Sequence, residues 1–484
     1  MTQEHRSAAD PVVLDGAPTA ADVVRVARED APVELAAAAR ERLVRSHERI
    51  QVLAGSEAPV YGVSTGFGAL STTRIPRDRW AELQESLVRS HAAGMGPPVE
   101  REVVRAMMFL RARTLALGYS GVRPEVVEQM LALLNAGLTP VVPEYGSLGA
   151  SGDLAPLAHA SLCLLGEGEL VDRDGTTVAA AAALAALGRE PLTLGPKEGL
   201  ALINGTDGML GMLVLACADF DALCGVAEIT GAMSTEALMG TDVAFSAPVM
   251  ALRPHPGQAR SAHAMHALLA GSQIVASHRD DDYRVQDAYS VRCAPQVIGA
   301  ARDVLGNAQR TAAVELASAV DNPSVLEDGR LVSNGNFHGV PLGFALDFLA
   351  IAAAEVGAIA ERRVDRMLDA TRSEGLPPFL AEDAGVHSGL MIAQYTAASM
   401  VAENRRLAAP ASVDSLPTSG MQEDHVSMGW GAARKLRQLL RNLERILAVE
   451  LTVSARGLQL RAPLAPAPAT AAVVELLGTT PGPD

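Results

Sequence analysis

Residues 146–159, GSLGASGDLAPLAH, contain three consecutive small residues at their centre, Ala150, Ser151 and Gly152. Because Gly152 has no side chain, its amide nitrogen can fold back toward the carbonyl carbon of Ala150. A five-membered ring that closes there, with loss of water at that carbonyl and from the Ser151 side chain, is an imidazolinone with an exocyclic methylene. No ordinary side chain supplies such an electrophile. The tripeptide therefore predicts a prosthetic group made from the chain itself.

The same residues also suit a simple turn. Clusters of Gly and Ser mark turns, and Asp153 is a good N-cap for a helix that starts near Leu154. Local composition by itself favours this second interpretation, so the ring needs support from other parts of the chain.

Side chains that could move a proton or hold a carboxylate occur in other short segments. Tyr61 lies in YGVSTGFG, and its phenol, with an ordinary pKa of about 10, could act as a base if helix N-termini or Arg292 stabilised the phenolate. Arg292 lies in QDAYSVRC, and its planar guanidinium suits a carboxylate. Taken singly, each residue type is more often structural. The remaining candidates are Asn204 in INGT, Gln286 and Tyr289 in QDAYSVRC, and Glu423 in MQEDHVSMG.

Residues 62–66 also have the GxSxG spacing of a hydrolase nucleophile elbow. Such an elbow needs a strand before it and a helix after it on a βαβ scaffold, whereas the pattern around this segment is helical. A hydrolase is therefore a weak alternative.

Most of the chain, roughly residues 61–461, resembles the histidine and aromatic amino-acid ammonia-lyases. The resemblance is carried by GSLGASGDLAPLAH, YGVSTGFG, INGT, QDAYSVRC and MQEDHVSMG. In that family the prosthetic group is 4-methylidene-imidazol-5-one (MIO), made from Ala-Ser-Gly. The resemblance implies that Ala150, Ser151 and Gly152 form MIO, that no external cofactor is required, and that the reaction removes ammonia from an α-amino acid.

The resemblance also implies roles for the other candidates. Tyr61 would be the base that takes the β-proton, and Asn204 would lie beside the prosthetic group. Arg292 would bind the substrate carboxylate. Gln286 and Tyr289 would add hydrogen bonds to the carboxylate or the ring, and Tyr289 is counted with the catalytic residues.

Substrate choice is expected to depend on His91 and Glu423. The pair Ser90-His91 is similar to the histidine-specific members of the family, and a carboxylate from Glu423 could accept the N–H of an imidazole ring. A phenyl ring would leave both groups unpaired, at a cost in binding. We therefore expect conversion of L-histidine to trans-urocanate and ammonia. Phe337 and Met391 are plausible walls of the pocket, although core packing would explain them equally well.

Two other readings of the function remain open at this point. One is a phenylalanine or tyrosine ammonia-lyase, or a 2,3-aminomutase, on the same scaffold. The other is a helical scaffold whose loop never cyclises. Assays with histidine, phenylalanine and tyrosine would separate these possibilities.

The apolar pattern predicts a mainly α fold. We expect an N-terminal α domain over residues 1–200, carrying the catalytic loops and short hairpins, and a long-helix bundle over 201–484 with a Pro/Ala-rich linker and a short last helix. The family resemblance implies that this bundle is similar to the central bundle of fumarase and aspartase. Hairpins are expected at Asp174-Gly175 and Asp328-Gly329. Long helices are expected over residues 207–233, 258–277, 295–320, 340–368, 388–407 and 427–453. Their apolar faces indicate a homo-oligomer, and the resemblance implies a homotetramer with shared active sites.

Composition limits the partners. The 484 residues include 40 Lys and Arg against 56 Asp and Glu, a net charge of −16, without a basic stripe, so we expect neither nucleic acid nor a membrane surface as partner. Neither a signal peptide nor a membrane span is expected, and four cysteines without CxxC spacing fit reduced, buried thiols in the cytoplasm. The His263 and His266 pair makes no convincing metal site.

Overall fold

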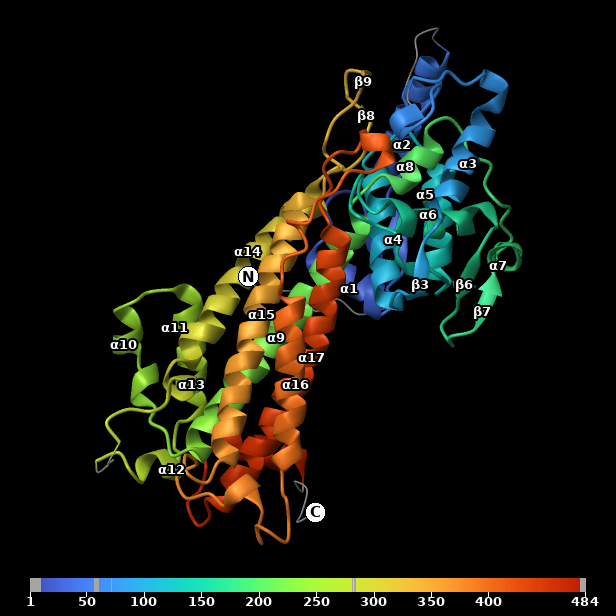
Figure 1. Cartoon of the computed structure of the whole chain (residues 1–484). Coiled ribbons are helices and arrows are strands. Elements are labelled where there is room, and N and C mark those ends of the chain that lie inside the picture. The colour runs from blue at the N-terminus through green and yellow to red at the C-terminus, as the bar shows by residue number, and fades with distance from the viewer. Residues whose placement is uncertain (1–9, 56–60, 71, 281, 283, 479–484) are drawn as a thin grey trace. The chain divides into compact units, whose positions relative to one another are not determined.

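The structure is a computed structural model that describes residues 10–55, 61–70, 72–280, 282 and 284–478 (Figure 1). It is mainly α, as the sequence predicts, and its strands are short. Residues 1–9, part of the segment in which we expected no signal peptide, lie outside the described residues.

The described chain forms two compact units. The first contains residues 1–215, 309–346 and 411–434, and the second contains residues 216–308, 347–410 and 435–484. Each unit thus combines three stretches of sequence, whereas the predicted division cuts the chain once, between residues 200 and 201. The units differ from that division because four long helices pass from the residues of one unit into those of the other. These helices are α9 (Asp207–Ala237), α14 (Ala294–Ala317), α15 (Val340–Leu368) and α17 (Gly429–Leu460).

The first unit is built from shorter helices and small strand pairs. Its helices are α1 (Ala20–Arg28), α2 (Ala37–Ala54), α3 (Trp80–His91), α4 (Arg101–Ala116), α5 (Pro124–Asn135), α6 (Leu154–Leu162), α7 (Ala180–Ala186) and α8 (Glu198–Ile203). Its strands are β1 (Val12–Leu14), β2 (Val33–Leu35), β3 (Met95–Pro98), β4 (Thr139–Pro140), β5 (Pro143–Tyr145), β6 (Glu169–Val171), β7 (Thr177–Ala179), β8 (Ser324–Val325) and β9 (Leu331–Val332).

The strand pairs confirm both predicted hairpins. β6 pairs with β7 and β8 pairs with β9, in each case antiparallel, and β4 adds a third strand beside β6. The parallel pair β1–β2 and the antiparallel pair β3–β5 were not anticipated. Each of these pairs joins short segments that are separated in sequence, so no local turn signal marks them.

The core of the first unit surrounds α4. Every residue from Val103 to Ala116 is buried, and α1, α5 and α6 all contact this helix. α3, α6 and α8 also pack on one another. This arrangement matters for function because His91 ends α3, Asn204 directly follows α8, and the Ala-Ser-Gly tripeptide ends two residues before α6.

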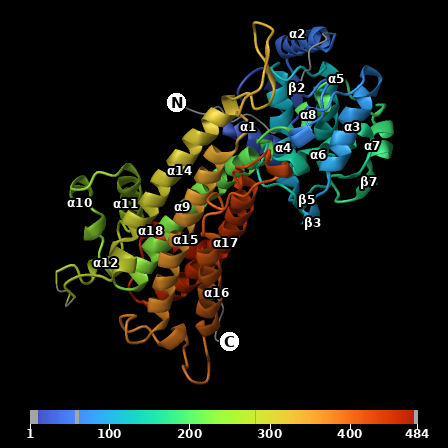
Figure 2. The same cartoon turned by 45° about the horizontal axis from the view of Figure 1, so that its top comes forward.

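The second unit is a helical bundle. Segments of α9, α15, α16 (Met391–Leu407) and α17 run side by side in both views (Figures 1 and 2). The smaller helices are α10 (Ala247–Ala251), α11 (Pro256–Leu268), α12 (Gln273–Ala276), α13 (Tyr289–Arg292) and α18 (Pro468–Leu477). A core cluster of the bundle includes Met233, Leu238, Val364, Met367 and Val453.

One predicted long helix is wrong. The segment 258–277 divides into α11 and α12, because Gly271 adopts a positive φ of 82° between them. Leu268 is the last residue of α11. The apolar spacing continues across the break, which is why periodicity alone did not reveal it.

Two apolar helical stretches, residues 198–237 and 340–368, are long enough to cross a membrane by length and composition. In each, 61% of the most apolar window is buried inside the protein, as in core helices of a bundle. Cys163, Cys217 and Cys224 are buried free thiols, as expected, whereas Cys293 is only half-buried.

Candidate active site

The loop with the small tripeptide connects β5 to α6 in the first unit. Ala150 is 9% exposed and Gly152 is buried. The loop is held by a second segment of the same unit, since the Met428 amide donates to the Leu148 carbonyl at 2.9 Å and the Ser427 hydroxyl donates to the Gly149 carbonyl at 3.2 Å. The tripeptide therefore lies in a fixed, largely buried loop rather than an open surface turn.

Gly152 is held where no other residue fits. Its φ is +79°, and a Cβ at this position would lie 2.2 Å from the carbonyl oxygen of Gly205. The same oxygen accepts a 2.7 Å hydrogen bond from the Asp153 amide. The requirement for a glycine here thus has two independent physical causes, a left-handed backbone and a close backbone contact.

We expect Gly152→Ala to lose both stability and ring formation. The positive φ alone costs about 1–3 kcal/mol for alanine, and the clash with Gly205 adds to it. Gly175→Ala is the matched control, because Gly175 has a φ of +82° with nothing within 4 Å of its Cβ position. Thermal unfolding and intact-protein mass measure the two losses. Equal behaviour of the two variants would show that the Gly205 contact is unimportant.

Asp153 does more than begin α6. Its side chain makes no capping hydrogen bond on its own helix. Instead, its carboxylate accepts 2.9 Å hydrogen bonds from the amides of Gly208 and Met209, in the first turn of α9. Burial raises the pKa of this carboxyl to about 7, and the charge of Asp207 adds to the rise. The sequence-based interpretation of Asp153 as a simple N-cap is therefore wrong, and the residue ties the start of α9 to the loop.

Asn204 follows α8 directly. Its side-chain Nδ2 donates to the Asn322 carbonyl at 2.7 Å, while its Oδ1 is buried without a hydrogen-bond partner among the described residues. Gly205, the next residue, lies against Gly152, so Asn204 is one residue away from a direct contact with the tripeptide. A buried acceptor without a donor is costly, so the position favours a bound polar group.

The Glu423 charge raises the pKa of both Tyr61 and His91, which places all three side chains within electrostatic range of one another in the first unit. Tyr61 is half-buried, and its hydroxyl accepts from the Gly68 amide at 3.4 Å. Burial raises the pKa of Tyr61, and Glu423 raises it further. These contacts within the first unit therefore do not supply the stabilised phenolate on which the role of Tyr61 as a base was made conditional.

His91 is the last residue of α3 and is half-buried. Its Nδ1 lies 2.9 Å from the Leu87 carbonyl oxygen. A carbonyl only accepts, so this nitrogen carries the proton and Nε2 presents a lone pair when the ring is neutral. Burial lowers the pKa of His91, which favours the neutral ring, although Glu423 acts in the opposite direction.

Glu423 is anchored rather than free in solvent. Its Oε2 accepts a 2.9 Å hydrogen bond from the Thr418 hydroxyl, and the backbones of the two residues exchange hydrogen bonds of 2.8 and 3.3 Å. Phe337 is half-buried, and the His338 ring beside it in the chain stacks on His425 with centroids 5.3 Å apart.

Gln286, Tyr289 and Arg292 belong to the second unit, so the structure describes them apart from the residues above. Tyr289 is 71% exposed, and the Arg292 guanidinium lies 4.7 Å from the centre of its ring. The Nε of Arg292 is buried without a hydrogen-bond partner among the described residues. Met391, the predicted wall residue, begins α16 in the same unit.

Sequence reasoning missed three residues next to this site. Lys197, Asp321 and Asn322 form a buried chain of polar contacts that ends at Asn204. The sequence signals were a lysine beside Glu198 in the segment LGPKEGLAL and an Asp-Asn-Pro turn after a helix. The GxSxG spacing, in contrast, does not form an elbow, because the segment lies in a turn that leads to a 3₁₀ helix at Gly68–Leu70.

Comparison with known proteins gives a consistent result. The family described as "Aromatic amino acid lyase" matches residues 19–479. The histidine ammonia-lyase of Streptomyces griseus is 61% identical over 479 residues, covering 98% of this chain and 93% of that protein. Tyrosine aminomutase from Streptomyces globisporus has a similar structure, with a TM-score of 0.92, 41% identity and coverage of 98% and 94%. Histidine ammonia-lyase from Trypanosoma cruzi has a TM-score of 0.88, 40% identity and coverage of 96% and 88%.

Proposed function

Since the chain belongs to the aromatic amino acid lyase family, we propose that it is a carbon–nitrogen lyase that converts L-histidine to trans-urocanate and ammonia. The observation that carries the substrate assignment is its 61% identity, over 98% of its length, to a histidine ammonia-lyase. The neutral imidazole of His91 and the carboxylate of Glu423, which lie together in the first unit, support it chemically.

The alternative of a phenylalanine or tyrosine lyase, or an aminomutase, is less favoured. A tyrosine aminomutase shares the fold at a TM-score of 0.92, but one fold hosts several reactions, and its identity to this chain is only 41%. The polar ring-binding groups also favour histidine, because a phenyl ring would leave Glu423 without a donor from the substrate.

MIO formed from Ala150, Ser151 and Gly152 is the proposed prosthetic group. The residues present fit it. Gly152 occupies a position closed to any side chain, and Asn204 offers an unpaired buried oxygen next to Gly205, the residue that contacts Gly152. When formed, MIO supplies an electrophile for the substrate amino group, which is otherwise a poor leaving group.

Side chains of this protein transfer the proton and bind the substrate. Tyr61 takes the β-proton as the general base. Arg292 holds the substrate carboxylate through a bidentate contact, and Gln286 and Tyr289 add hydrogen bonds. Glu423 accepts the N–H of the substrate imidazole, with His91 alongside the ring.

The active form is proposed to be a homotetramer in the cytoplasm. Support for an oligomer comes from an apolar groove of about 400 Å³ between α14 and α15, lined by residues such as Val304 and Ile351. Ile392 and Tyr395 on α16 are also 61% and 60% exposed. Such surfaces are typical of oligomer contacts. Light scattering of the purified protein measures the number of subunits, and a monomer would contradict this part of the proposal.

The activity is tested with L-histidine, L-phenylalanine and L-tyrosine in turn, following ultraviolet absorbance and free ammonia. Urocanate from histidine alone is the expected result. Cinnamate, coumarate or a β-amino acid would instead favour the alternative, and no product from any substrate would overturn both.

We expect Glu423→Gln to weaken histidine turnover selectively. Loss of a hydrogen bond to a charged acceptor lowers kcat/KM for histidine by about 10–100-fold. Phenylalanine, measured as a substrate or as a competitive inhibitor, should change by less than about threefold, since it makes no such bond. Asp424→Asn, an exposed neighbour in the same loop, is the matched control. Equal losses for both ligands would contradict the assigned role of Glu423.

A further inference from the structure

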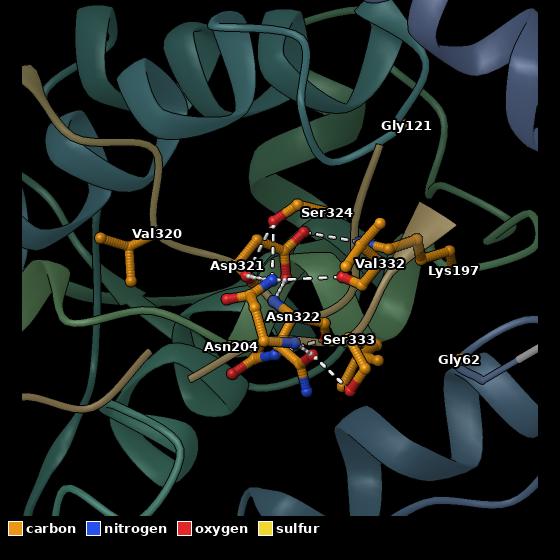
Figure 3. Close-up of polar contacts among 12 residues, drawn as sticks. Gly62, Gly121, Lys197, Asn204, Val320, Asp321, Asn322, Ser324, Val332 and Ser333 are labelled. Carbon is orange, nitrogen blue, oxygen red and sulfur yellow. Dashed lines mark hydrogen bonds and ion pairs between the residues drawn. The ribbon is translucent and has the colours of Figure 1, made fainter. Parts of the chain in front are cut away.

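Lys197 and Asp321 form an ion pair in the interior of the first unit (Figure 3). Lys197 Nζ lies 2.6 Å from Asp321 Oδ2, and the two side chains are 0% and 2% exposed. Lys197 directly precedes α8 and has a φ of +68°, a left-handed conformation that is costly for a lysine. Burial lowers the pKa of Lys197, and the Asp321 charge opposes this.

Stability alone is a poor explanation for such a pair. Removing two charges from water costs several kcal/mol per ion, and well-packed apolar residues of similar size are often equally stabilising or better. A strained backbone at Lys197 adds to the cost. The contacts made by the pair therefore indicate its purpose better than its strength does.

The first set of contacts leads to Asn204. Asp321 uses its second oxygen, Oδ1, to accept a 2.8 Å hydrogen bond from the Asn322 amide. The Asn322 carbonyl then accepts from Asn204 Nδ2 at 2.7 Å. Because a carbonyl only accepts, this bond sets which way the Asn204 amide faces and leaves Oδ1 as its unpaired end. A continuous polar chain thus connects Lys197 to Asn204.

The second set of contacts leads to Tyr61. A Cβ built on Gly62, which follows Tyr61, would lie 2.7 Å from Leu200 Cδ2, 3.7 Å from Pro323 Cδ and 3.8 Å from Lys197 Cγ. The glycine-rich loop therefore passes close to the stem of Lys197 and to the turn that follows Asp321, as well as to Leu200 of α8. Figure 3 shows Lys197, Asp321, Asn322 and Asn204 grouped together, with Gly62 on the neighbouring segment.

We propose that the Lys197–Asp321 pair is a positioning device that holds Asn204 and the Tyr61 loop in register for ring formation and turnover. The proposal rests on the function proposed above. Both residues act through others and are positioning residues, not catalytic ones. A salt bridge suits this task because Lys197 holds one oxygen of the Asp321 carboxylate. The other oxygen is then directed at the Asn322 amide.

The test compares three double variants of the full-length protein. Lys197→Met/Asp321→Leu removes both charges and the acceptor for the Asn322 amide. Lys197→Met/Asp321→Asn removes both charges but keeps that acceptor. Arg302→Met/Glu228→Gln removes a control pair in the second unit, whose atoms lie 2.7 Å apart with side chains 6% and 7% exposed.

Three readouts are taken for each variant: thermal unfolding, the fraction of chains lacking two water molecules by intact mass, and kcat and KM for L-histidine per cyclised chain. For Lys197→Met/Asp321→Leu we expect a midpoint within about 5 °C of the unmodified protein. Either the cyclised fraction or kcat should be about 100-fold lower than in the unmodified protein, and KM should change less than about threefold. Lys197→Met/Asp321→Asn should recover about tenfold of that loss, because it restores the acceptor.

The proposal is overturned if Lys197→Met/Asp321→Leu loses no more of the cyclised fraction and of kcat than the Arg302→Met/Glu228→Gln control. It is also overturned if Lys197→Met/Asp321→Asn, which restores the acceptor, recovers none of that loss. If the leucine variant does not fold, the asparagine variant carries the same comparison against the control. The unmodified protein decides the proposed function separately: without a mass deficit or urocanate release, that function fails regardless of the variants. When the unmodified protein shows both the mass deficit and urocanate release, the ratios of cyclised fraction and of kcat between the variants decide the role of the pair.

Discussion

Replacement of Ser151 by alanine is expected to abolish ammonia release while the protein stays folded. The Ser151 hydroxyl is the group lost in the second dehydration, so alanine cannot produce the exocyclic methylene. Ser151 is only half-buried, and removing one hydroxyl there leaves the packing of the loop nearly unchanged. We expect kcat to fall by at least about 10³-fold, equivalent to about 4 kcal/mol of transition-state stabilisation.

Intact-protein mass checks the cause directly. The unmodified chain should weigh two water molecules less than its sequence predicts, and Ser151→Ala should lack this full deficit. Ser147→Ala is the control, because Ser147 bonds the Gly149 amide at 3.2 Å in the same loop but contributes no ring atom. It should keep the deficit. A fully active Ser151→Ala enzyme would remove the basis for an MIO group here.

Tyr61→Phe is expected to have the second largest effect. Loss of a general base lowers kcat by about 10²–10⁴-fold. KM for histidine should change little, because the phenol is assigned to the proton and not to binding. Phe67, whose ring lies 6.3 Å from that of Tyr61 in an edge-on contact, provides the control Phe67→Leu in the same loop. A Tyr61→Phe variant with nearly normal kcat would require another base.

The pH dependence follows from the same residue. Burial and Glu423 raise the pKa of Tyr61, so the basic phenolate is a minor form at neutral pH and its fraction grows as pH rises. We therefore expect kcat/KM to increase with pH above neutrality and this increase to vanish in Tyr61→Phe. Glu423→Gln removes a charge that raises the pKa, so its rising limb should move to lower pH. A shift to higher pH would contradict the proximity of the two groups.

Structural features that depend on residues a few positions apart could be predicted from the sequence alone. Helix positions such as Val340–Leu368 follow from apolar periodicity, and the hairpin turns follow from Asp-Gly pairs, because both depend on residues a few positions apart. The need for glycine at position 152 was likewise visible from the chemistry of ring closure. The sequence also determined the candidate residues themselves, since their types and motifs imply the reaction.

Tertiary structure decided what those residues experience. Tyr61, His91 and Glu423 lie far apart in the chain. Only the fold could bury the Tyr61 phenol and bring the Glu423 charge near it, and both effects raise the pKa of Tyr61. The same holds for Asp153, whose carboxylate binds the start of α9 and not its own helix. The Lys197–Asp321 pair joins residues 124 positions apart. Burial and long-range electrostatics depend on which segments meet in space, and no local pattern encodes that meeting.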